Sequence, residues 1–170
     1  MKFTITGKSL NELYQEYGQG LGGFYSQWWE KRSFADEKPE AGIYELDLSD
    51  KLKNLTLDEQ KAKLEKGCEV AHPAIVAEAI LSHYKKTSER LCKDYCLRTK
   101  SVDSDSSWVN VGLFDSDGLD VNYYWGDYRY GSGVSSARKL KSLKSEPLSL
   151  ESRILKLEKF KESVEKVLKI

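Results

Sequence analysis

The sequence predicts a single α+β domain over residues 1–170, in which several helices pack on one small antiparallel sheet. Three observations predict this class: a hairpin pattern at 107–125, a strand pattern at 43–48, and a helical block that separates the two. This order disfavours a repeated β–α–β arrangement. A chain of 170 residues can bury a sizeable core and needs no metal or disulfide to fold.

The strands are predicted from apolar residues that alternate with polar ones. In the hairpin, the turn segment Asp115-Ser116-Asp117-Gly118 separates two alternating runs, and Gly118 can adopt a positive φ. The alternation directs Tyr123 and Trp125 into the core and leaves Tyr124 on the other face. The 43–48 strand alternates apolar and acidic side chains, which is typical of a half-buried strand. Residues 3–5 could start a further short strand.

The predicted helices span 9–17, 57–66, 73–86 and 149–169. A capping box opens each of the first two, and Pro73 occupies a first helical turn, where proline is tolerated. The Ala-rich face of 73–86 makes it the expected central helix, and 88–96 either continues it after a break or forms a separate helix. The long amphipathic helix at 149–169 either closes the core or forms an interface.

Composition excludes several classes of protein. The 27 basic and 27 acidic residues balance, which argues against nucleic acid as a partner. No apolar run approaches the ~20 residues of a membrane helix, so no membrane association is expected. Three cysteines, an odd number, suit a reducing compartment, and we expect a cytoplasmic protein. Although the net charge of the whole chain is zero, residues 101–130 are acidic and residues 131–170 are basic, and these segments could pair within the fold.

Motifs for catalysis, metals and cofactors are weak or missing. Cys68 and His72 lie in a connection between helices, where His72 is interpreted as a helix cap. Cys92 and Cys96 are better explained as buried thiols of a helix than as zinc ligands. The aspartates of 103–127 do not form a calcium-binding loop, and those at the hairpin tip are interpreted as turn residues. We therefore predict no metal and no cofactor.

The segment 131–139 combines glycines and serines with two cations, Arg138 and Lys139. It is interpreted as a loop that runs into the start of a basic helix, where backbone N–H groups and cations attract anions. It matches neither a Walker loop nor a dinucleotide fingerprint. Anion binding is therefore a hypothesis set against an ordinary capped loop.

An aromatic cluster lies directly before that segment. Tyr and Trp combine a flat apolar face with a polar tip, which suits interfaces. The leading hypothesis is a non-catalytic binding or interaction module, a monomer or weak homodimer, whose partner is a protein or a small anionic ligand. Its predicted binding residues are Tyr124, Tyr128, Arg129, Tyr130, Arg138 and Lys139.

Two alternatives stay open. One is a small enzyme acting on a phosphorylated or anionic substrate, which the 131–139 Gly/Ser loop would hold while Asp127 or His72 acts as acid or base. The other is a structural or oligomerising protein that associates through the C-terminal helix.

Overall fold

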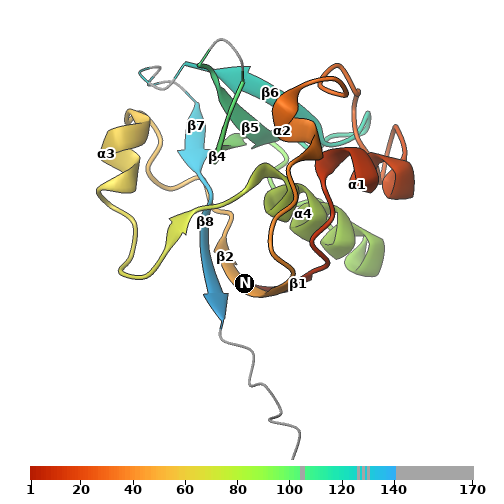
Figure 1. Cartoon of the computed structure of the whole chain (residues 1–170), viewed down its shortest axis with the longest axis horizontal. Helices are drawn as coiled ribbons and strands as arrows, with labels where there is room; N and C mark the ends of the chain where they lie inside the picture. Colours follow the sequence, from red (N-terminus) through yellow and green to blue (C-terminus); the bar gives the residue numbers. More distant parts are fainter. Residues whose placement is uncertain (104–105, 126, 128, 130, 141–170) are drawn as a thin grey trace, which may run out of the picture. The chain divides into compact units, whose positions relative to one another are not determined.

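A computed structural model describes residues 1–140 apart from 104–105, 126, 128 and 130. Residues 1–140 form one compact unit. Figure 1 shows its elements in chain order. They are β1 (Lys2–Ile5), α1 (Leu10–Tyr17), α2 (Ser33–Asp36), β2 (Gly42–Asp47), α3 (Leu57–Lys61), β3 (Glu69–Val70), α4 (Pro73–Thr87), β4 (Cys96–Val102), β5 (Trp108–Gly112), β6 (Asp120–Tyr124), β7 (Ser132–Val134) and β8 (Ser136–Leu140).

The strands form two four-stranded sheets, with orders β1-β2-β8-β3 and β6-β5-β4-β7. The prediction of one small antiparallel sheet is therefore wrong in number and in direction, because β4 and β7 pair in parallel. The class is still mixed α and β, but its details differ from those predicted. The 149–169 helix of that prediction lies outside the described residues.

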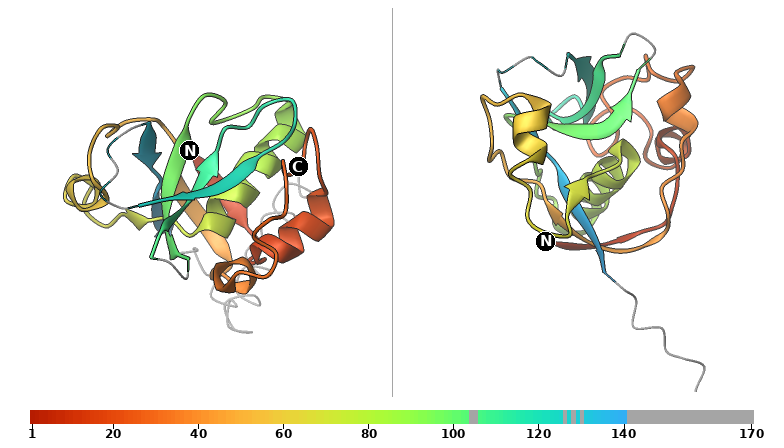
Figure 2. Two further views of the ribbon diagram at one scale, coloured as in Figure 1. Left: turned by 90° about the horizontal axis from the view of Figure 1, so that it is seen from above. Right: turned by 60° about the vertical axis from the view of Figure 1, so that its left-hand side comes forward.

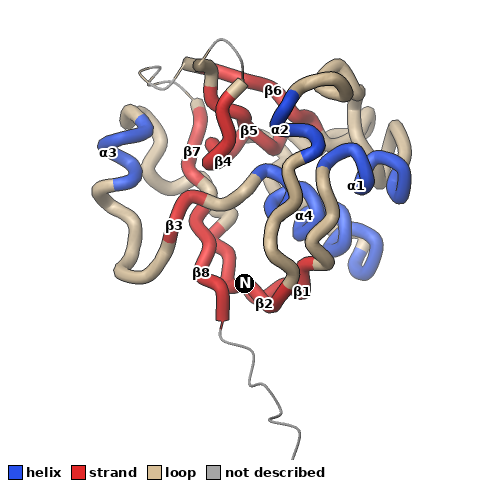
Figure 3. The backbone as a smooth tube through the Cα atoms, viewed as in Figure 1, coloured by secondary structure: helices blue, strands red, loops and turns tan. Residues whose placement is uncertain are grey.

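The two sheets are joined where β7 passes into β8. Between these strands, the backbone N–H and the hydroxyl of Ser135 both donate to the Arg98 carbonyl, at 3.0 and 2.8 Å. The Ser135 carbonyl accepts from Ala71, whose own carbonyl accepts from Lys100. One bent segment thus adds an edge strand to one sheet and a central strand to the other (Figure 3).

The helix α4 is the centre of the core, as its Ala-rich face predicts. Each residue from Pro73 to Leu81 is buried, and the helix contacts α1 and strands of both sheets. Figure 2 shows the helix lying against the sheets in two further views. The alternation of β2 is also confirmed, since Tyr44 and Leu46 face this core while Glu45 and Asp47 face outward.

The helix starts are confirmed in atomic detail. Both predicted capping boxes are formed, by Ser9 with Glu12 and by Thr56 with Glu59. His72 caps α4, because its Nδ1 accepts from the N–H of Ala74.

Two helix predictions need correction. The helix α3 ends at Lys61 rather than at 66, because its final turn tightens into hydrogen bonds between residues three apart. Segment 88–96 is not helical: Ser88 ends α4 in the left-handed conformation, and β4 begins at Cys96.

The predicted hairpin forms from β5 and β6, with Val111 opposite Val121. Its turn is as predicted, since the N–H of Asp117 donates to the Asp115 carboxylate at 2.7 Å. Gly118 has φ +123°, and a Cβ there would lie 2.5 Å from the carbonyl carbon of Phe24. Glycine is therefore required by both backbone conformation and space.

The far end of the hairpin departs from the simple alternation. Tyr123 is 43% exposed and Trp125 is 67% exposed, so the prediction that both point into the core is wrong. The core ends before this tip, where Trp28 occupies the position beside the Tyr123 ring, at 5.1 Å between centroids.

Among the helices that the structure describes, none has the length and apolarity to cross a bilayer.

Candidate functional site

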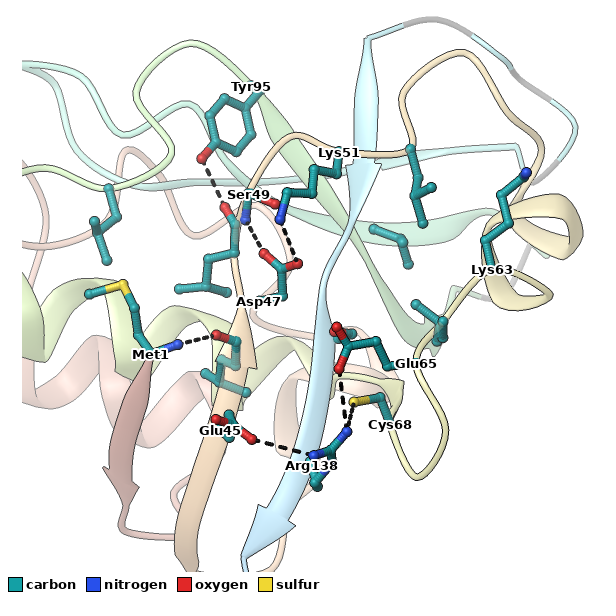
Figure 4. A pocket seen from close by; sticks show the side chains of 17 residues that line it. Met1, Glu45, Asp47, Ser49, Lys51, Lys63, Glu65, Cys68, Tyr95 and Arg138 are labelled. Atoms are coloured by element: carbon teal, nitrogen blue, oxygen red, sulfur yellow. Dashed lines mark hydrogen bonds and ion pairs between the residues drawn. The ribbon is translucent and has the colours of Figure 1, made fainter.

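A groove of about 700 Å³ lies on the outward face of β2 and β8. Its other wall is the segment 48–68, which runs from the end of β2 through α3 to the start of β3 (Figure 4). Side chains from Leu52, Leu64 and Leu91 give it apolar surface. The volume is typical of ligand-binding clefts. We call this cavity the β2–β8 groove.

Arg138, one of the predicted binding residues, projects from β8 into the groove (Figure 4). It lies opposite Glu45 in the strand register. Its Nη2 donates to the Lys66 carbonyl at 3.1 Å and contacts the Cys68 thiol at 3.5 Å. Two neutral groups thus hold the guanidinium in place, and its side chain is still 37% exposed.

Two carboxylates also approach this guanidinium, and Nη2 donates to one of them, Glu65, at a distance similar to that of the Cys68 thiol. Glu45 lies 3.6 Å from Nη1, and Glu65 lies 3.4 Å from Nη2 with 85% of its side chain exposed. Exposed ion pairs of this kind contribute about 0–1 kcal/mol. An anion that enters the groove can therefore replace Glu65 on Arg138 at little cost, since the guanidinium keeps its bonds to Lys66 and Cys68.

The opposite end of the groove holds a second ion pair, Lys51–Asp47, at 3.8 Å. Burial raises the pKa of Asp47, but the hydrogen bond that it accepts from the Ser49 N–H and the nearby Lys51 charge outweigh this effect, so its pKa lies below the ordinary value. The Tyr95 hydroxyl donates to the Leu48 carbonyl at 2.8 Å, and burial is the main cause of its raised pKa. The Ser49 hydroxyl is buried with no hydrogen-bond partner among the described residues.

A third cation, Lys63, stands at the rim of the groove beside α3 (Figure 4). Within the described part of the chain its ammonium makes no ion pair, whereas Arg138 and Lys51 both do. The cations and carboxylates of the groove are equal in number among these side chains. Among the ion-paired side chains of the groove, however, Arg138 is the least exposed, which favours an anionic group at that point.

Cysteine chemistry separates Cys68 from the other two thiols. Cys68 is partly exposed in the groove, whereas Cys92 and Cys96 are buried, as predicted. Burial raises the pKa of Cys92 to about 12 and that of Cys96 to about 11. The predicted helical location is wrong, because Cys92 follows α4 with φ +55° and Cys96 begins β4. In the described ranges, no three His, Cys, Asp or Glu side chains gather as a metal site would require.

The structure brings two other predicted residues to one corner of the second sheet, beside α3. Tyr124 lies opposite Trp108 in the pairing of β6 with β5, and the Lys61 ammonium lies 4.5 Å from the Trp108 ring centroid. Arg129 makes a two-pronged contact with Glu59 of the same helix, at 3.0 and 3.1 Å. Tyr124 and Arg129 thus share a neighbourhood, while Arg138 lies in the groove.

Lys139, a further predicted binding residue, does not join this surface. Lys139 points to the face of β8 opposite Arg138, where it pairs with Glu40 and lies over the Tyr44 ring. Tyr128 and Tyr130 lie outside the described residues.

The interpretation of 131–139 as a loop before a helix is wrong. Residues 132–134 form β7, and 136–140 form β8. A Cβ at Gly133 would lie 3.1 Å from the Leu97 side chain and 3.2 Å from the Lys51 carbonyl. The small residues therefore allow close packing of a strand, and no helix N-terminus follows them among the described residues.

Two surfaces of the structure were not predicted from the sequence. Trp28 is partly exposed, and its indole N–H donates to the Val121 carbonyl at 2.6 Å, so the aromatic surface at β6 draws on a distant segment. The groove joins residues 45 and 138, and only pairing of β2 with β8 brings them together. The outward acidic residues of β2 were the only sequence signal for this groove.

Comparison with protein-family models, curated proteins and solved structures finds no match.

Proposed function

We propose that this chain is a non-catalytic binding module and that its β2–β8 groove holds an anionic group of the ligand on Arg138. The observation that carries the proposal is the way in which that guanidinium is held at the cavity. It is held by a backbone carbonyl and a thiol, it faces a cavity, and the side chains of its two carboxylate partners are exposed to solvent, where an anion can compete with them. An arginine held in this way has little ordering entropy left to lose when an anion binds.

The aromatic corner around Tyr124 and Arg129 supports the same class of function. Exposed Tyr and Trp side chains supply contact area at interfaces, and Trp125 is the most exposed aromatic residue of the described chain. We assign this corner a supporting role, because Arg129 is already held by both oxygens of Glu59.

A thermal-shift titration with inorganic phosphate and with citrate tests the proposal. A ligand at one hundred times its dissociation constant stabilises the fold by about 2.7 kcal/mol, which is a shift of several degrees. We expect the shift in the wild type, no shift in Arg138→Ala, and a larger shift in Glu65→Gln, because this variant removes the internal competitor. Lys139→Ala is the matched control, since this cation projects from the same strand on the opposite face. An equal shift in Arg138→Ala and the wild type would refute the proposal.

The structure bears on the enzyme hypothesis but not on the oligomerising hypothesis. The enzyme hypothesis relied on a loop at 131–139, which is a pair of strands. His72 is buried against Glu37 and does not line the groove, and Asp127 is exposed. The oligomerising hypothesis rests on 149–169, outside the described residues, and a concentration-independent monomer mass in light scattering would count against it.

A further inference from the structure

The charges of the groove are spread along β2 rather than gathered at one point. Glu45 and Asp47 are alternate residues on the outward face of β2, so their side chains lie about 7 Å apart along the strand. Each carboxylate has one cation beside it, Arg138 for the first and Lys51 for the second. The two cations therefore lie beside successive outward positions of β2, as the acidic groups of an extended chain would require.

The apolar part of the groove comes from the opposite wall. Leu52 and Leu64 belong to segment 48–68 and face the same cavity as Arg138. An extended peptide directs alternate side chains to opposite sides, so acidic residues two apart can approach the cations while the residue between them contacts the leucines. This pattern of charge and apolar surface matches a peptide strand better than a compact anion.

We infer that the natural occupant of the groove is an extended segment of a partner protein in which acidic and apolar residues alternate. This inference rests on the proposed function and names its ligand. The first carboxylate of the segment replaces Glu65 on Arg138, and the second binds Lys51, with Lys63 as a further contact at the rim. The internal carboxylates lower the affinity for weak anions, so the groove selects ligands that present two acidic groups together.

The test uses a fluorescein-labelled hexapeptide of alternating Leu and Glu, measured by fluorescence polarisation with the whole chain. The matched probe has Lys in place of Glu, and unlabelled citrate serves as competitor. We expect saturable binding of the Leu–Glu peptide, at least tenfold weaker binding by Arg138→Ala and by Lys51→Ala, and tighter binding by Glu65→Gln. Lys139→Ala should bind as the wild type does. Melting curves of each variant show whether it is folded.

The outcomes separate this inference from the proposed function. Equal binding of the Leu–Lys peptide would overturn the inference, because the cations would then not select the ligand. A thermal shift with citrate that depends on Arg138, combined with a Leu–Glu peptide that binds no better than citrate, would also overturn it and leave the anion site intact. If neither citrate nor the peptide binds through Arg138, both statements fail.

Discussion

Replacement of Gln60 by Leu should strongly destabilise the fold. Gln60 is fully buried on α3, and its amide joins three segments. Its Nε2 donates to the carbonyls of Leu52 at 2.8 Å and Ser132 at 3.0 Å. Its Oε1 accepts from Nη1 of Arg98, a guanidinium that is itself buried, at 2.8 Å. Leucine fills similar volume but offers none of these bonds.

The expected loss follows from those three contacts. Each neutral hydrogen bond contributes about 1 kcal/mol, and one to a charged group contributes about 1.5–3 kcal/mol. The sum is a loss of about 3.5–5 kcal/mol, which is close to the cost of breaking a buried charge pair. Arg98 keeps its bond to the Leu55 carbonyl at 2.9 Å, which argues for the lower half of this range.

Urea unfolding followed by tryptophan fluorescence measures the change in the free energy of unfolding. Asp58→Asn on the same helix is the control, because its side chain is almost fully exposed, and it should change stability by less than about 0.5 kcal/mol. A loss below about 1 kcal/mol for Gln60→Leu would show that this amide does not join α3 to the sheet in the way described.

Three further predictions concern single residues. Gly118→Ala should cost several kcal/mol, because it places a Cβ against Phe24 at a positive φ, and a lowered urea midpoint would show it. Burial of His72 lowers its pKa, so its stabilising contribution is complete above about pH 6.5 and is lost as the pH falls below that value. Melting at about pH 7.5 and about pH 5.5 should therefore show a smaller pH effect in His72→Asn, which still caps α4, than in the wild type; an equal effect would contradict this assignment. Trp28→Phe removes the indole N–H donor to β6, and we expect a loss of about 1–2 kcal/mol in urea unfolding.

Local signals predicted the elements whose structure is decided by nearby residues. Ser9 and Thr56 cap helices because each has a glutamate three positions later, and the Asp115–Gly118 turn needs only its own residues. The alternation around Tyr44 predicted the face of β2 because one side of that strand is buried.

The features that the sequence did not predict depend on contacts between distant segments. Gly133 looks like a residue of a flexible loop, but β4 and the backbone near Lys51 pack against it and make its segment a strand. Trp125 follows the alternation of β6 yet is exposed, since the core ends before it. The groove was not predictable from local sequence either. Arg138 contacts Glu45 because β8 pairs with β2, and it contacts Glu65 and Cys68 because the chain turns back beside β8.

The central claim is that Arg138 is the anion-binding group of the groove. Its Nε is buried with no hydrogen-bond partner among the described residues, and the N–H of this atom gives a separate signal in a ¹H–¹⁵N correlation spectrum of arginine side chains. The signal is assigned by its loss in Arg138→Lys. Titration with citrate should shift it saturably while the Arg129 signal stays in place, since Glu59 already holds that guanidinium. An assigned Arg138 signal that does not move over the whole titration would contradict the account.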